Sequence, residues 1–166
     1  MSSRTVSAYV DPHARRLVDA INASSFDAET FACCSGHYHK PSTPYIAFRC
    51  RSWDFPHFLL PALTAINSAT RGQTRLRLSE QRCDEIKGSI RFVVYGWLLA
   101  GSDLRPLLIE EVSPPRRLVK LWWRELDELA AMIEERRTRP SLEILELFDA
   151  VRGRSRRRLS ARSIRS

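Results

Sequence analysis

Ile90-Arg91-Phe92-Val93-Val94-Tyr95-Gly96-Trp97-Leu98 is the stretch that decides the fold. β-Branched and aromatic residues dominate it, and such residues favour extended backbone. Its length and apolar content predict a central strand of a sheet. Residues 74–80, Thr-Arg-Leu-Arg-Leu-Ser-Glu, alternate polar and apolar side chains, which is typical of a strand with one face in water. We expect these two strands to form a long antiparallel hairpin.

Upstream, two more strands are predicted at residues 29–33 and 45–50, joined by a loop rich in proline and histidine. This connection is short enough for antiparallel pairing. Asp11 followed by Pro12 is the pattern of a helix start, and it predicts a first helix over residues 12–22.

Apolar residues at helical spacing from Phe58 to Ile66 predict the second helix. Pro61 lies within this run, so we expect the helix either to start late or to be kinked at the proline.

Downstream, Ser113-Pro114 begins a long amphipathic helix with apolar residues at helical spacing from Leu118 to Ile133. Glu134 and Glu135 follow and are interpreted as solvated charges. Arg139-Pro140 ends that pattern, and a last helix is predicted from Ser141 to Val151. The order α-β-β-α-β-β-α-α predicts an α+β fold, a four-stranded, mainly antiparallel sheet with helices packed on it.

The chain's basic charge is concentrated at its C-terminal end. The net charge of the 166 residues is +8, but residues 152–166 contain seven arginines and no acid. We therefore divide the chain into a single α+β domain, residues 1–151, and a disordered Arg-rich tail, residues 152–166. Arginines pair with phosphates, so Arg154, Arg156, Arg157 and Arg158 are predicted to bind nucleic acid.

No signal peptide or membrane-spanning stretch is visible in the sequence, so we expect a cytoplasmic protein without a membrane partner. In that compartment the cysteines are expected to be thiols or metal ligands and not disulfides. The oligomeric state is left open.

The most reactive residue types are concentrated at Cys33-Cys34-Ser35-Gly36-His37-Tyr38-His39-Lys40. The candidate metal ligands are Cys34, His37, His39 and Cys50, which could form part of a zinc site, although no second closely spaced ligand pair is present. A cysteine nucleophile beside a histidine base is the alternative, but no acid is placed to orient the imidazole. The remaining interpretation is a strand followed by a loop in which Cys34, Ser35, Gly36 and His37 form a binding surface. Trp123 is a candidate contact for a partner.

Two resemblances are carried by this part of the chain. Ile21-Asn22 followed by Phe31-Ala32-Cys33-Cys34-Ser35-Gly36 resembles the motif of the wybutosine-synthesising tRNA methyltransferases, with Cys33 and His37 in place of that family's serine and arginine. This resemblance implies S-adenosylmethionine as cofactor and a modified tRNA as substrate. The Cys-x-Gly-His turn also looks like one in uncharacterised small phage proteins.

The leading hypothesis is a small non-enzymatic binding protein or inhibitor, of phage or mobile-element origin, that engages a nucleic acid or a nucleoprotein complex. It would use its folded surface together with the arginine tail. An S-adenosylmethionine-dependent RNA-modifying enzyme and a zinc-stabilised interaction module are the alternatives.

Overall fold

The computed structural model describes residues 10–36, 43–69, 74–81, 90–98 and 115–163. Its sheet has four strands, β1 (Ala28–Ser35), β2 (Pro44–Cys50), β3 (Thr74–Gln81) and β4 (Ile90–Leu98). The strand order is β1-β2-β4-β3, and every neighbouring pair is antiparallel. The α+β class, the element order, the central position of β4 and the β3–β4 hairpin are therefore confirmed.

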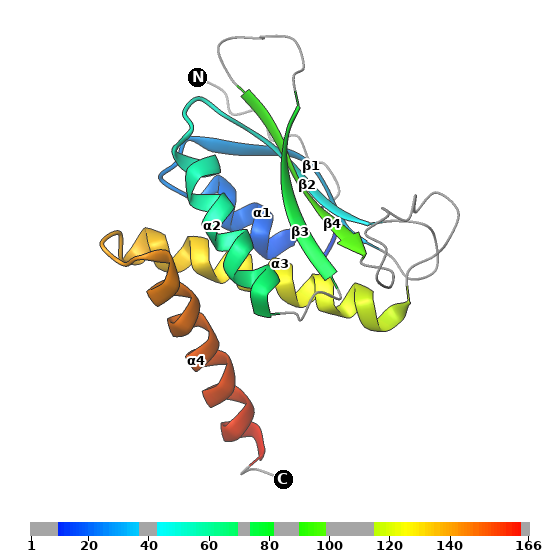
Figure 1. The fold of residues 1–166 in the computed structure, drawn as a ribbon, viewed down its shortest axis with the longest axis vertical. Coiled ribbons are helices and arrows are strands. Elements are labelled where there is room, and N and C mark those ends of the chain that lie inside the picture. The colour runs from blue at the N-terminus through cyan, green and yellow to red at the C-terminus, as the bar shows by residue number, and fades with distance from the viewer. Residues whose placement is uncertain (1–9, 37–42, 70–73, 82–89, 99–114, 164–166) are drawn as a thin grey trace.

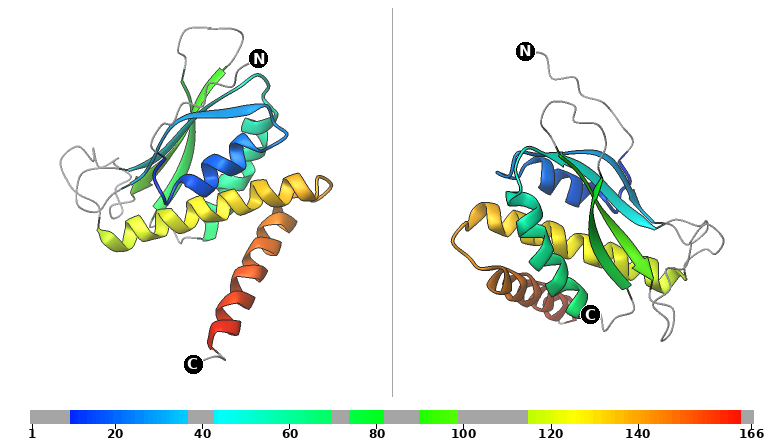
Figure 2. Two further views of the ribbon diagram at one scale, coloured as in Figure 1. Left: turned by 180° about the vertical axis from the view of Figure 1, so that it is seen from behind. Right: turned by 45° about the horizontal axis from the view of Figure 1, so that its top comes forward.

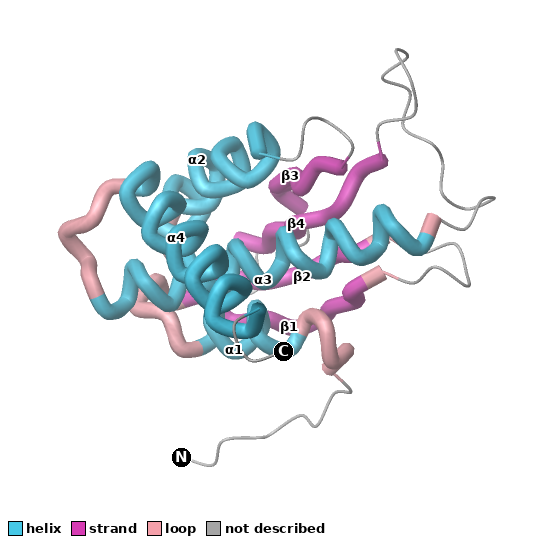
Figure 3. Tube along the Cα trace, turned by 90° about the horizontal axis from the view of Figure 1, so that it is seen from below, coloured by secondary structure: helices cyan, strands magenta, loops and turns pink. Residues whose placement is uncertain are grey.

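Four helices accompany the sheet, α1 (Arg15–Asn22), α2 (Asp54–Ala69), α3 (Arg116–Thr138) and α4 (Ile144–Ser163). The first three lie on one face of the sheet, and α4 extends from this helical layer away from the strands (Figure 1). Figure 3, seen from the side of the helices, shows α1, α2 and α3 in front of the strands. One sheet face is covered in this way, and no described helix lies on the other.

The core fills the space between the sheet and these helices. Period-two alternation sends Ile46 and Phe48 of β2 inward, beside their β4 partners Val94 and Phe92. All four side chains are buried, and the helices contribute large apolar groups such as Phe55 and Trp122. Burial of this apolar surface is the main stabilising term of the fold.

Gly96 is required where β4 passes closest to its neighbours. A Cβ at this position would lie 2.6 Å from Cγ of Pro44 and 2.8 Å from Nε1 of Trp122. Both contacts are shorter than van der Waals distance, so only glycine fits between β2 and α3 here. The sequence pattern indicated a strand without giving this reason for its glycine.

All four helices begin elsewhere than expected. α3 begins at Arg116 with Pro115 as its N-cap, not with Ser113-Pro114, and α4 begins at Ile144, not at Ser141.

α1 begins at Arg15, after a turn in which the carbonyl of Asp11 accepts hydrogen bonds from the amides of Ala14 and Arg15. α2 begins at Asp54, so Pro61 lies in the interior of the helix and the expectation of a late start is wrong. Proline has no amide hydrogen to donate, and α2 accommodates this loss on an exposed position.

The largest difference concerns the C-terminal segment. α4 continues to Ser163, so residues 152–163 are helical and neither the predicted end at Val151 nor the predicted disorder of the tail is correct for them. Arginine is a good helix former, and no proline interrupts these residues. An ion pair from Arg154 to α3 also holds the first turn beyond Val151.

Candidate nucleic-acid interface

The sheet face on which no described helix lies carries arginines and aromatic rings in two rows. Residues directly opposite one another in antiparallel strands point to the same face. Tyr45 is opposite Tyr95, which is in turn opposite Arg77, so these three form one row across β2, β4 and β3. Tyr45 is 40% exposed. An aromatic row is therefore available to a ligand on this face.

The second row contains two arginines. Arg49 of β2 is opposite Arg91 of β4, and Glu29 of β1 is opposite Arg49. Four residues separate Tyr45 from Arg49, which places the two rows about 13 Å apart along the strand. Ala47 and Val93 lie between the rows, and they are only 5% and 8% exposed. We call these two rows together the open sheet face.

Each arginine of the second row has a neighbour that fixes its position. Nη2 of Arg49 lies 2.6 Å from Oε2 of Glu29, in an ion pair whose side chains are both more than half exposed. The guanidinium carbon of Arg91 lies 5.5 Å from the centroid of the Phe31 ring. Phe31 lies at an irregularity in the β1–β2 register between Thr30 and Ala32, and its side chain is 46% exposed. Exposed ion pairs contribute little to stability, so Arg49 can exchange Glu29 for another anion at low cost.

Cys34, Ser35 and Gly36 lie at the end of β1, and Trp123 of α3, which the sequence singled out separately, lies against them. Their geometry serves the fold, because Ser35 is buried and its carbonyl oxygen accepts a 3.0 Å hydrogen bond from Nε1 of Trp123. Gly36 has a φ of 80°, which favours glycine and turns the chain out of the strand. His37 lies outside the described residues.

Asp11 completes this cluster from the turn before α1. Its Oδ1 accepts hydrogen bonds from Oγ of Ser35 at 2.6 Å and from the amide of His13 at 3.1 Å. His13 stacks on Trp123 with ring centroids 3.6 Å apart. These contacts join α1, β1 and α3 around a buried serine hydroxyl that is already hydrogen-bonded. The binding roles of these residues stay predictions.

The candidate zinc ligands are not all brought together. Cys34 is paired with Tyr45, whereas Cys50 lies five residues further along β2, or about 16 Å away. A zinc ion binds sulfur at about 2.3 Å, so one ion cannot bind both thiolates. His37 and His39 lie outside the described residues, and among those described no group of three metal-binding side chains is found. Burial raises the pKa of the Cys50 thiol to about 11 and also raises that of Cys33, so neither favours a thiolate at neutral pH.

The arginines of α4 divide into two kinds. Arg154 forms an ion pair with Glu135 of α3, Nη1 to Oε2 at 3.0 Å, and Glu135 is only 5% exposed. Arg139 reaches the same carboxylate at 3.3 Å. Arg156 and Arg157 are exposed, and the side chain of Arg158 lies outside the described residues. Arg154 is therefore a structural residue as well as a candidate phosphate contact.

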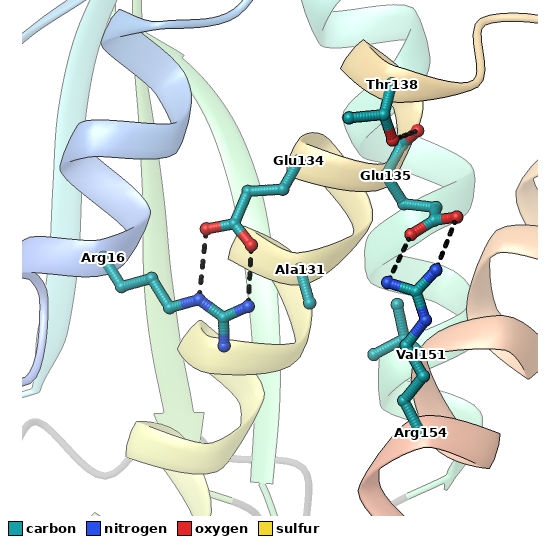
Figure 4. A pocket seen from close by; sticks show the side chains of 7 residues that line it. All are labelled: Arg16, Ala131, Glu134, Glu135, Thr138, Val151 and Arg154. Carbon is teal, nitrogen blue, oxygen red and sulfur yellow. Dashed lines mark hydrogen bonds and ion pairs between the residues drawn. The ribbon is translucent and has the colours of Figure 1, made fainter.

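Adjacent glutamates connect α3 to two other helices. Glu134 accepts two hydrogen bonds from Arg16 of α1, while Glu135 faces Arg154 of α4 (Figure 4). They flank a cavity of about 250 Å³ that Ala131 and Val151 also line. The interpretation as a solvated charge is therefore wrong for Glu135, which is only 5% exposed, whereas Glu134 is 47% exposed. Successive helix residues point about 100° apart, so the two carboxylates meet different partners.

The residues of the open sheet face were not singled out in the sequence. The apolar character of residues 45–50 predicts a strand but does not indicate that Tyr45 and Arg49 point outward. The sequence signal for outward positions is their period of two residues. Arg91 and Tyr95 fit this period within the apolar run of residues 90–98. Only the strand order shows that these positions from two distant segments lie side by side.

The chain matches no family model, no curated protein and no solved structure in the three comparisons. In the described part of the chain, no helix is long and apolar enough to cross a membrane. The function must therefore be argued from the surface itself.

Proposed function

We propose that this protein binds nucleic acid through the open sheet face, without catalysing a reaction. The observation that carries the proposal is the register of this face, which sets a row of tyrosines beside a row of arginines on a sheet surface that no described helix covers. The arginines of residues 152–166, most of which lie in α4, also favour a nucleic-acid partner.

The charges of the face favour a polyanion. Arg49, Arg77 and Arg91 point outward on the described strands, and Glu29 is the acid opposite Arg49. Guanidinium groups bind phosphate oxygens and displace their counterions, which gives affinity that falls with salt. A phosphate can replace Glu29 as the partner of Arg49.

The rings of the face favour bases. Aromatic side chains on an exposed sheet surface stack on unpaired bases, at about 1–3 kcal/mol per base. Tyr45 and Tyr95 lie directly opposite each other, and Phe31 is exposed beside Arg91. We therefore expect single strands to bind at least as tightly as duplexes of the same length.

Fluorescence anisotropy with labelled single-stranded and duplex RNA and DNA tests the proposal. The double variant Arg49→Gln/Arg91→Gln should weaken binding about tenfold or more, and the magnitude of the slope of log K against log salt should fall by about 1.4 to 1.8, since each lost phosphate contact removes about 0.7–0.9. Arg49 is exposed and Arg91 is partly exposed, so the melting temperature should change little.

The matched control is Arg117→Gln/Arg124→Gln, which removes two exposed charges from α3 in the helical layer. It should bind as the unmodified chain does. If both double variants weaken binding equally, the total charge of the protein and not the open sheet face determines the affinity. If the unmodified chain binds no oligonucleotide, the proposal is refuted.

A further inference from the structure

The second half of α4 is a basic arm that extends beyond the core. Leu147 and Val151 are the last apolar residues of the helix that are buried among the side chains that the structure describes, and α4 then runs on to Ser163. At 1.5 Å per residue these twelve further residues add about 18 Å. Residues 152–163 include six arginines and no acid. We call residues 152–163 the arm.

The side chains of the arm that the structure describes support an anion-binding surface. Arg156 and Arg157 are exposed, and the guanidinium of Arg152 lies 4.8 Å from the ring of Phe148. At the base of the arm is a depression of about 460 Å³, and its lining residues are Arg139, Asp149, Ala150, Gly153, Arg154 and Arg157.

Three guanidiniums therefore border one open space. Nothing lies within 4 Å of the position that a Cβ of Gly153 would take, so the glycine leaves this surface clear. Glu135 and Asp149 offset part of the charge, and Arg157 and the rest of the arm provide the excess. A phosphate is the anion that such a set of planar donors fits best.

The arm and the open sheet face lie on opposite sides of the molecule. α4 contacts α2 and α3, which cover the inner face of the sheet. Figure 1 and both views of Figure 2 show the arm running away from the strands beyond the helical layer. A layer of helices about 10 Å thick and the sheet itself separate the two surfaces. The two surfaces therefore face away from each other.

We propose that one molecule binds two nucleic-acid segments at once, one on the open sheet face and one along the arm. The inference rests on the proposed function for the first segment, and adds a second site and a bridging activity. The occupant of the arm follows from charge, since six arginines on one short helix repel a second copy of the same arm and attract a phosphate backbone.

A bridging assay tests this inference with the full chain. A single-stranded RNA of about eight nucleotides, within the length that one small domain covers, is immobilised, and a second, fluorescent RNA of the same length is added with the protein. The expected result is protein-dependent capture of the fluorescent strand. The variant Arg152→Gln/Arg156→Gln/Arg157→Gln, which keeps Arg154 and its ion pair, should reduce capture at least tenfold while its binding to one strand persists.

Three other outcomes overturn the inference. Capture that persists in the triple variant assigns bridging to something other than the arm, such as self-association. Absence of capture by an unmodified chain that binds one strand shows a single site. Absence of any binding refutes the proposed function as well, and anisotropy with the same RNA distinguishes this case from the previous one.

Discussion

Asp11 and Trp123 both form hydrogen bonds with Ser35, a residue far from each of them in the sequence. Asp11 followed by Pro12 predicts a helix start, but α1 begins at Arg15 with Ala14 as its N-cap, and Asp11 lies in the turn before it. The same carboxylate also accepts hydrogen bonds from Ser35, 24 residues away, and so fixes the end of β1. Trp123 donates to the carbonyl of Ser35 from α3, 88 residues away. No sequence spacing could have indicated these contacts, because they depend on how the helices pack on the sheet.

Replacement of this carboxylate should destabilise the fold. Asp11→Ala leaves the buried hydroxyl of Ser35 without its acceptor and removes the bond to the amide of His13, at a cost of about 2–4 kcal/mol. Urea unfolding measures this free energy. Asp19→Ala, an exposed carboxylate of α1, is the control and should change it by less than about 0.5 kcal/mol. Equal unfolding midpoints of the two variants would contradict the role assigned to Asp11.

Among the elements, β3 and β4 were well predicted because their hairpin is local and their pattern is strong. Pro61 leaves two alternatives for α2, a late start or a kink, and the late start is wrong because α2 buries apolar residues on both sides of the proline. The pairing of β2 with β4 could not be read from the sequence, because these strands are separated by α2 and β3. The open sheet face depends on that pairing.

The charge pattern of residues 152–166 predicts disorder, whereas α4 continues to Ser163. A run of arginines without acids is typical of disorder, but here the first turn of the run is held by Glu135, a buried carboxylate of α3. Deletion of residues 152–166 would leave Glu135 with Arg139 as its ion-pair partner among the described residues. Charge substitutions therefore separate binding from folding better than a truncation at Val151 does.

Two neighbouring arginine substitutions should differ in their effect on stability. Arg154→Gln weakens the compensation of the buried Glu135 and should cost about 1–2 kcal/mol, with Arg139 limiting the loss. Arg156→Gln, which removes an exposed charge from the same helix, should cost less than about 0.5 kcal/mol. Urea unfolding of both variants measures the difference. Equal effects would show that the pair between α3 and α4 does not hold the helices together.

At the scale of the whole molecule, the fold separates two basic surfaces that the sequence presented as one feature. The net charge of the chain was assigned to its C-terminal end, and residues 1–151 are nearly neutral. One face of the sheet nevertheless combines arginines from β2, β3 and β4. Two acids of α3, Glu134 and Glu135, instead form ion pairs with other helices. Net charge along the sequence is therefore a poor guide to a surface formed by distant strands.

The most direct measurement of the central claim is photo-crosslinking of the full chain to single-stranded RNA that carries a photoreactive uridine, followed by mass spectrometry of the peptides. The arrangement of the open sheet face predicts crosslinks in β2 and β4, at or beside Tyr45 and Tyr95, and their loss in the Arg49→Gln/Arg91→Gln variant. Crosslinks confined to α1, α2 and α3, and unchanged in that variant, would contradict nucleic-acid binding by the sheet.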